Sequence, residues 1–486
     1  MSDFRPAPLP PRPNKSVDSV FELQGANSFP EAQAIPLQYV QPSPVAQPVQ
    51  QLGLQPPAPL GQVNPPVDNY SPQYQQPLAY NQQPVYQQQP EPIYYTPAQY
   101  GQANNLGYDM PQQALPWMLP QSFSPRSSAM KTLAWVGASI GALLLLCILG
   151  FSSLTYGFST SLISMILAFF PLAMITACLI WVGRWDAEPW GMRILAFLWG
   201  AGGSIALTLG FTYLANLLGL SPDRSDIFAQ AALQAPPIEE FSKGIGMLLI
   251  ALFLRRYFDG PVDGVVYMAT IASGFAFTEN ILYFGASEAQ AGAAGLGSTF
   301  ILRAVMSPFA HVIFSIPMGI AVGIARQRGF STGKTIGLFF LAYPLSFILH
   351  GLWNASSSIL TDTWFVFYIL VQVPIFAAAV FVVIWLRKTE AKITYKRLTE
   401  YGWAGWFTPQ EVDSFSTWQG RKQVYRWARS RSPQAGTLMK DITKDVVKLA
   451  YVREKIARGN ISDGVLEQEN EILNRVSTNK SYLLAI

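Results

Sequence analysis

The sequence predicts an all-α, polytopic membrane protein: a bundle of about eight transmembrane helices with a disordered N-terminal arm and a small helical cytoplasmic tail. Apolar runs long enough to cross a bilayer follow one another between Leu133 and Leu386. Prolines concentrate elsewhere, because 25 of the 37 lie before residue 129. Basic residues are found mainly in every second connection between the apolar runs. These observations divide the chain into residues 1–128, 129–388 and 389–486.

Residues 1–128 form the expected arm. Besides proline it repeats Gln, Tyr, Asn and Ser, as in "YSPQYQQPLAYNQQPVYQQQPEPIYYTPAQY". Such a segment cannot bury enough apolar surface to offset the entropy of ordering it, so we expect a disordered, partly polyproline II chain. Its prolines and tyrosines suit the binding of cytoplasmic partners, and a tether without specific partners is the simpler interpretation. No basic segment followed by an apolar one opens the chain, so no cleavable signal peptide is expected.

The apolar runs are expected to be helices, because a helix satisfies its own backbone polar groups in lipid. They cover residues 133–154, 161–182, 194–217, 236–254, 262–284, 301–324, 335–357 and 364–386. The basic connections carry Arg184 and Arg193, Arg255 and Arg256, Arg326, Arg328 and Lys334, and Arg387, Lys388, Lys392, Lys396 and Arg397. The positive-inside rule places these connections, and both termini, in the cytoplasm. The net charge of +4 therefore reflects orientation in a lipid bilayer and does not indicate nucleic-acid binding.

Residues 389–486 and the cysteines are expected to be structural. Thr408 with Glu411 matches a capping box. Apolar residues then recur at helical spacing, which predicts short amphipathic helices that pack on themselves or lie on the anionic inner leaflet: Leu438, Ile442, Val446 and Leu449. Cys147 and Cys178 lie inside the first two runs without metal-ligand spacing, so we expect buried apolar fillers rather than a disulfide.

Four consecutive runs contain polar residues that lipid disfavours, since a charge at the bilayer centre costs about 2.5–3.5 kcal/mol. They are Glu239, Glu240 and Lys243 in "PPIEEFSK", Glu279 and Asn280 in "GFAFTENILYF", His311 in "RAVMSPFAHVIFS", and His350 and Asn354 in "LHGLWNASS". A single histidine in a span is usually a packing residue. Here both histidines of the chain occur together with three glutamates, which favours a functional site.

Depth in the bilayer supports one shared site. With the orientation above and a rise of ~1.5 Å per residue, the polar residues of all four runs fall in its outer half. Lys243 can neutralise one carboxylate of its own helix, and Glu239 and Glu240 diverge by about 100°, so only one of them points squarely into a shared pocket. Pro236 and Pro237 suit a first helical turn, which would place both carboxylates near the positive end of the helix.

A carboxylate, histidines and an amide together suit peptide-bond hydrolysis. The carboxylate can act as a general base toward water, and His and Asn can donate hydrogen bonds to an oxyanion. Other protease designs fit less well. No HExxH zinc motif occurs, Asp259 and Asp263 lie at a predicted cytoplasmic connection, and "IASGF" has Ile271 where a rhomboid-type GxSG motif needs glycine.

Four motifs in order resemble the PrsW family of bacterial intramembrane proteases, relatives of the CAAX prenyl endopeptidases and of the wider group of glutamate-dependent membrane peptidases. They are "EEFSK" as EExxK, "FAFTEN" as FxxxEN, the histidine of "SPFAH", and "HGLWN" as HxxxN. The resemblance covers about residues 130–390. It implies a multi-pass protein of the bacterial cell membrane that cleaves a membrane-anchored protein near the outer face. The family precedent suggests regulated proteolysis of a signalling protein.

The resemblance also implies roles for the residues. Glu239 would activate water, Glu240 with Lys243 would hold the site in shape, and Glu279, next to Asn280, would assist at the water. His350 with Asn354 would form the oxyanion hole, and His311 would be a further catalytic group or a metal ligand.

Two alternatives stay open. Family members have been called metalloproteases, and Glu239, Glu279, His311 and His350 would suit zinc. Because Lys243 would repel a divalent cation, we favour a metal-independent reaction of the glutamic type. A proton- or ion-coupled transporter also uses intramembrane carboxylates, but we detect no inverted repeat, and the polar residues lie in only four of the eight runs.

Overall fold

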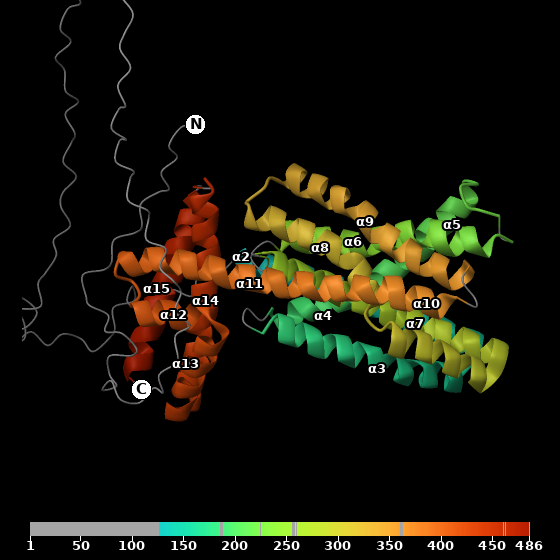
Figure 1. The fold of residues 1–486 in the computed structure, drawn as a ribbon, viewed down its shortest axis with the longest axis horizontal. Helices are drawn as coiled ribbons and strands as arrows, with labels where there is room; N and C mark the ends of the chain where they lie inside the picture. Colours follow the sequence, from blue (N-terminus) through green and yellow to red (C-terminus); the bar gives the residue numbers. More distant parts are fainter. Residues whose placement is uncertain are drawn as a thin grey trace, which may run out of the picture. The chain divides into compact units, whose positions relative to one another are not determined.

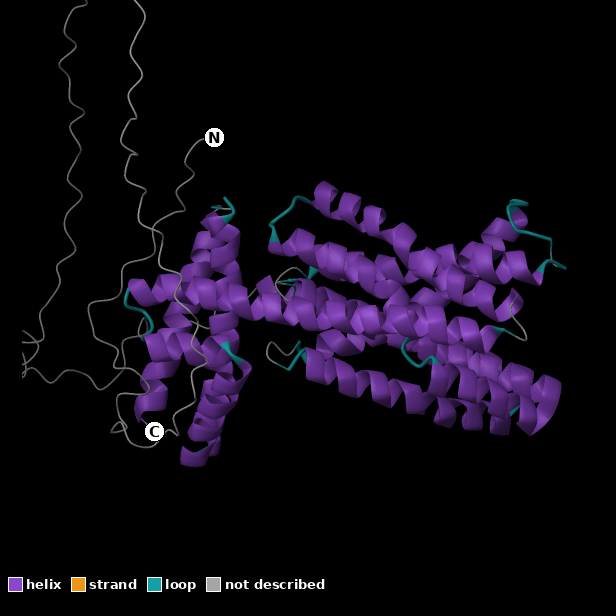
Figure 2. Ribbon diagram, in the orientation of Figure 1, coloured by secondary structure: helices purple, strands orange, loops and turns teal. Residues whose placement is uncertain are grey.

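The computed structural model describes residues 126–184, 188–223, 225–254, 258, 260–359, 363–459, 461 and 463–485. Regular structure within these ranges is entirely helical, as Figure 2 shows. This confirms the predicted all-α class. The arm expected over residues 1–128 lies outside the described residues except for its last three, which begin the first described helix.

Helices in the apolar part of the chain are mostly long, and several contain a π-helical turn, labelled η. Their bounds are α2 Arg126–Tyr156, α3 Phe158–Val182, α4 Trp190–Leu198, η2 Trp199–Ser204, α5 Ile205–Leu217, η3 Ala229–Gln234, α6 Ala235–Phe253, α7 Pro261–Phe300, η5 Ile301–Met306, α8 Ala310–Gln327, α9 Thr332–Ile359, α10 Trp364–Phe367, η6 Tyr368–Gln372 and α11 Val373–Trp403. Four helices follow: α12 Pro409–Ser416, α13 Trp418–Arg431, α14 Pro433–Ala457 and α15 Asp463–Ala485.

Each predicted apolar run coincides with helix in the described part of the chain (Figure 1). By length and composition, 6 stretches of the described residues qualify as membrane spans. The number of qualifying stretches is smaller than the number of predicted runs for two reasons. One qualifying stretch, Pro261–Gln327, contains two of the predicted runs, and α6 is absent because Glu239, Glu240 and Lys243 lower its hydropathy. The protein is therefore a multi-pass membrane protein.

The connection expected at residues 285–300 is helical rather than a loop. Helix α7 continues through it and reverses at Gly292, whose φ of 60° and ψ of −153° are not helical. Glycine adopts this conformation without steric cost. Ser287 and Thr299 form a hydrogen bond of 2.7 Å across the reversal. The result is a helical hairpin that leads into η5 and α8.

Helix α7 is the central element of the membrane part and packs closely through glycines. At Gly264 a Cβ atom would lie 2.1 Å from the carbonyl oxygen of Gly319 on α8, and at Gly274 a Cβ would lie 2.2 Å from that of Phe197 on α4. Small residues at such contacts let membrane helices approach closely. The side chains that α7 contributes to the site are therefore held against α4 and α8.

The C-terminal helices pack on themselves around an apolar core. The predicted capping box is confirmed, since Thr408 Oγ1 accepts from the amide of Glu411, and the Glu411 carboxylate accepts from the amide of Thr408. Ile442, Val446 and Leu449 of α14 are buried in this core. Helix α11 runs without a break across the predicted boundary at residue 388.

The two cysteines differ from the expectation of burial. Both are free thiols, as expected, but both are exposed on the protein surface. They lie on α2 and α3, so they face the surroundings of the helices rather than the core. Lipid-facing and buried positions are both apolar, and composition therefore did not separate them.

Candidate active site

Helix α6 provides the two neighbouring carboxylates. It begins at Ala235 with prolines in its first turn, as expected, but the π-helical turn η3 precedes it without a break. The carboxylates are consequently not at a free helix end, and the predicted contribution of the helix dipole is wrong. Pro236 lacks an amide hydrogen, and π-helical turns of this kind often occur at functional sites.

Glu240 is the centre of a fully bonded group. Its side chain is buried, forms an ion pair with Lys243 on the same helix, and accepts a hydrogen bond of 2.6 Å from Ser315 of α8. Its other contact is with Nδ1 of His350 at 2.9 Å. Because a carboxylate only accepts, this nitrogen carries a proton, and Nε2 of the neutral ring is then an acceptor.

Glu279 forms a second group with α8 and η5. Its carboxylate pairs with Arg303 and lies 2.7 Å from Nε2 of His311. Arg303 also donates through Nε to Asn280 at 2.7 Å. The nitrogen Nδ1 of His311 faces the Lys243 ammonium at 3.4 Å. His311 therefore fits a neutral ring that donates to Glu279 and accepts from Lys243.

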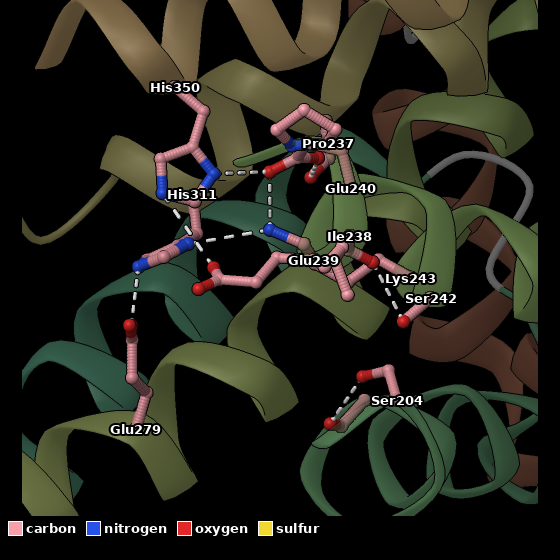
Figure 3. Close-up of polar contacts among 12 residues, drawn as sticks. Ser204, Pro237, Ile238, Glu239, Glu240, Ser242, Lys243, Glu279, His311 and His350 are labelled. Atoms are coloured by element: carbon pink, nitrogen blue, oxygen red, sulfur yellow. Dashed lines mark hydrogen bonds and ion pairs between the residues drawn. The ribbon is translucent and has the colours of Figure 1, made fainter. Parts of the chain in front are cut away.

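Glu239 lies between these two groups (Figure 3). Its carboxylate is 3.7 Å from Nε2 of His350, and the rings of the two histidines are 5.1 Å apart. The atom Oε2 of Glu239 is buried and has no hydrogen-bond partner among the described residues. A buried polar atom without a partner is costly and uncommon, which makes this position one where a ligand or substrate water is expected.

The charges of the site balance except at Glu239. Lys243 accompanies Glu240, and Arg303 accompanies Glu279. Neither cation forms an ion pair with the third carboxylate in the described structure, where its contact is with a histidine. Among three glutamates in one buried cluster, Glu239 is thus the one whose charge is not matched by a hydrogen-bonded cation.

Comparisons with known proteins identify the family of the chain. A family model described as "PrsW family intramembrane metalloprotease" matches residues 188–379, which include every residue of the cluster. Protease PrsW of Oceanobacillus iheyensis is 32% identical over 167 residues, which cover 34% of this chain and 70% of that protein. The chain belongs to the PrsW family. It is therefore an intramembrane peptidase, and this assignment decides against the transporter alternative.

Further relatives bear the same name. Protease PrsW of Geobacillus kaustophilus is 30% identical over 171 residues, 35% of this chain and 69% of that protein. Protease PrsW of Clostridioides difficile is 32% identical over 174 residues, 35% of this chain and 69% of that protein. No solved structure was found to match the chain.

This PrsW-family site contains most of the residues that the motifs predicted. Six of them contact one another in the cluster directly, and Asn280 joins through Arg303: Glu239, Glu240, Lys243, Glu279, His311 and His350. Asn354 differs, because its amide donates to the carbonyl of Ala231 in η3 at 2.8 Å. Asp263 caps the start of α7 by accepting from Gly260 and takes no part in the cluster.

Two residues of the site were missed. Arg303 bridges Glu279 and Asn280, and Ser315 donates to Glu240. Arg303 had a signal in the sequence, because it is a charged residue inside an apolar run and carries the same insertion cost as the glutamates. Ser315 had none, since a hydroxyl is common in a membrane helix and bonds readily to its own backbone.

The family description raises the question of a metal ion. Glu239, His311 and His350 each offer a ligand atom, and these atoms lie within 4.8 Å of one another. Two imidazoles and a carboxylate are a frequent ligand set of catalytic zinc, and Glu240 would orient His350 as an outer-shell carboxylate. The residues therefore fit a divalent cation in type and spacing, although Nδ1 of His311 is directed at an ammonium group here.

Proposed function

We propose that this protease hydrolyses a peptide bond of a membrane-anchored protein near the outer face of the membrane, with Glu239 as the general base. The observation that supports it is the unmatched carboxylate: Oε2 of Glu239 has no hydrogen-bond partner within the described ranges, whereas Glu240 and Glu279 are each bonded to a cation. A carboxylate that is not neutralised keeps its affinity for a proton and can take one from water.

The neighbours of Glu239 position the reaction. Glu240, itself held by Lys243 and Ser315, fixes the ring of His350 so that Nε2 is directed toward Glu239. Water placed between Glu239 and the substrate carbonyl would lose a proton to Glu239 and add to the carbonyl carbon. The same carboxyl group can then return the proton to the leaving amine as the carbon–nitrogen bond breaks.

Donors to the oxyanion come from α9 in this proposal. His350 can donate from Nε2 when both ring nitrogens are protonated, because Nδ1 already donates to Glu240. The side-chain amide of Asn354, which donates to the carbonyl of Ala231 in the described structure, would supply the second donor. These two donors would stabilise negative charge on the substrate oxygen as it develops.

A bound divalent cation, held by Glu239, His311 and His350, would supply Lewis-acid activation of water. Our proposal remains the metal-independent reaction, for reasons of charge. Lys243 and Arg303 already balance two of the three carboxylates, so the cluster with neutral histidines has one net negative charge. A dication would leave one positive charge without a counterion in a region of low dielectric.

Orientation and biological role are also part of the proposal. In this proposal both termini are cytoplasmic and the site is nearer the outer face, an orientation that the alternation of cations in the sequence favours. The substrate is then a membrane-anchored protein cleaved on that side, and a signalling protein in regulated proteolysis fits this position. A reporter fused after Gly157 should lie outside the membrane, and one fused after Arg328 should lie in the cytoplasm. The reverse pattern would place the site nearer the cytoplasmic face.

The test of Glu239 compares two adjacent glutamine variants in reconstituted enzyme. Glu239→Gln preserves shape and removes the base, so cleavage of a membrane-spanning substrate should fall about 10²–10⁴-fold while thermal stability is kept. Glu240→Gln should lower stability as well as cleavage, since Lys243 loses its anion. Near-normal cleavage by Glu239→Gln, with loss in Glu279→Gln, would assign the base to Glu279. Retention of cleavage in all three would exclude a glutamate base.

A further inference from the structure

An apolar groove lies beside the catalytic cluster, between α3, α8 and α11. It consists of two cavities. The near cavity, about 290 Å³, is lined by η5, α8, α9, η6 and α11, and the far cavity, about 220 Å³, by α3, α7, α8 and α11. Phe309, Ile313 and Phe376 line both, so the two cavities are adjacent. The groove is separate from the polar cluster, whose residues it does not include.

The walls of the groove are shaped for a helix. On α3 the far cavity is lined by Ile175, Cys178, Leu179 and Val182, and on α11 by Phe376, Ala379, Val380 and Val383. Both sets repeat at i, i+3, i+4 and i+7, so each helix presents one continuous apolar stripe. Two stripes with a floor of α7 and α8 between them form the type of surface on which an apolar helix packs.

The length of the groove suits a transmembrane helix better than a single acyl chain. Along α11 and η6 the lining residues extend from Tyr368 to Ile384, which is about 24 Å at 1.5 Å per residue. The hydrocarbon core of a bilayer is ~30 Å thick, so one acyl chain covers about half of it. The groove crosses most of that thickness, which corresponds to a transmembrane helix.

The near cavity connects the groove to the chemistry. Phe314 lines it and also stacks on the ring of His350, with the ring centroids 4.9 Å apart. Gln372 lines the same cavity, is 8% exposed, and has an amide nitrogen without a hydrogen-bond partner in the described part of the chain. A buried amide donor needs an acceptor. Carbonyl groups freed where a substrate helix unwinds are acceptors of this kind.

We propose that this groove binds the transmembrane helix of the substrate, that Gln372 donates to its unwound backbone, and that Phe314 separates the bound segment from Glu239. This proposal rests on the protease function and adds where the substrate lies. Cleavage then requires that Phe314 turns aside, so that the scissile peptide passes from the near cavity to the cluster. A substrate whose helix is weak at that end is favoured, because unwinding costs it less.

The first experiment is cross-linking, which does not depend on cleavage. The probe is a single-span peptide with about 20 leucine and alanine residues and glycines at its outer end, carrying one cysteine at successive positions. In the Cys147→Ser, Glu239→Gln variant, Cys178 should form disulfides with probe cysteines at positions that recur every third or fourth residue along the probe. The control keeps Cys147 of α2 and has Cys178→Ser, and should show no such pattern. Absence of helical periodicity at Cys178 would overturn the proposal.

The second experiment uses a matched pair of neighbouring alanines on α11. Ala379 lines the far cavity, whereas Ala378 is exposed and does not line it. Ala379→Trp should raise KM for the glycine-containing probe about tenfold or more, and Ala378→Trp should leave it within about twofold. Gln372→Leu should lower kcat/KM about tenfold, by loss of one hydrogen bond to the reacting segment.

The outcomes separate the groove from the protease function. Cleavage that is equal in both tryptophan variants, with no cross-linking pattern, would overturn the groove and leave the function in place. A helical cross-linking pattern in the Cys147→Ser, Glu239→Gln variant, together with no cleavage of any probe by the protein with its native sequence, would support the groove and contradict the function.

Discussion

Two regions of this molecule bury networks of charge, and they differ in how completely the charges are paired. In the C-terminal helices, Arg397 and Arg453 each contact two carboxylates, and the buried ammonium of Lys480 lies 2.7 Å from Glu411. In the membrane, Lys243 and Arg303 satisfy Glu240 and Glu279, and Glu239 remains with a histidine at 3.7 Å. We call the first network closed because each of its carboxylates contacts a cation, and the second open at Glu239, whose carboxylate does not.

This difference separates a structural network from a chemical one. A buried carboxylate whose charge is matched by a contacting cation holds helices in register and offers little to a substrate. An unmatched carboxylate is unfavourable for folding and is useful only if something binds there. We therefore expect changes in the tail network to lower stability, and changes around Glu239 to lower the rate.

The largest effect is expected in the closed network. Lys480→Met leaves the fully buried Glu411 without its cation, which should lower the free energy of unfolding by about 3–5 kcal/mol. Unfolding of the full-length protein in detergent, followed by tryptophan fluorescence, measures this. The double variant Lys480→Met, Glu411→Gln should recover most of the loss. Normal stability combined with loss of cleavage would show that the tail serves the reaction directly.

Around the open position, the expected effect is on turnover. His350→Ala and Asn354→Ala should each reduce kcat about 10²–10³-fold by removing a donor to the oxyanion. Steady-state cleavage of a reconstituted membrane-spanning substrate gives the rates, and the melting temperature serves as the control. If Asn354→Ala instead lowers stability and keeps kcat, its role is to anchor η3 through Ala231 rather than to bind the oxyanion.

Arg303 provides a finer test, because it belongs to a paired group that borders the open one. Arg303→Lys keeps the charge beside Glu279 but cannot bond to both Glu279 and Asn280 in the planar geometry of a guanidinium. Cleavage should fall about tenfold, equivalent to ~1.4 kcal/mol of transition-state stabilisation. An unchanged rate would mean that only the charge of Arg303 matters.

The smallest expected effect is that of metal removal. Exhaustive chelation should leave cleavage unchanged, since two cationic side chains already balance the cluster to within one charge. Elemental analysis of the purified protein before and after chelation accompanies the assay. Stoichiometric zinc whose removal abolishes cleavage would show that the open position is a metal site, with Glu239, His311 and His350 as ligands.

The membrane helices and most site residues were predictable from the sequence because lipid imposes strong rules. Apolar length marks a helix, and a charge within it, such as Glu279, marks a function. Helix geometry alone did not separate the roles of Glu239 and Glu240, because a difference of 100° on one helix does not tell on which side the partner helices lie; only the family resemblance implied the separation. The reversal at Gly292 was missed because helical hairpins and loops share small residues. Exposed Cys178 was expected to be buried, since lipid and core both favour apolar surfaces.

The π-helical turn η3 has a consequence for the phase of the helix that follows it. A π turn contains one residue more than an α turn, and one residue corresponds to a rotation of about 100°. Glu239 and Glu240 differ by that same angle. If the same residues formed α turns, α6 would be rotated by about that angle relative to the chain before it, so Glu239 would leave its present position and the ion pair of Glu240 with Lys243 would turn with it. The extra residue between Ala229 and Gln234 thus acts as an angular offset that decides how both glutamates of α6 meet His350.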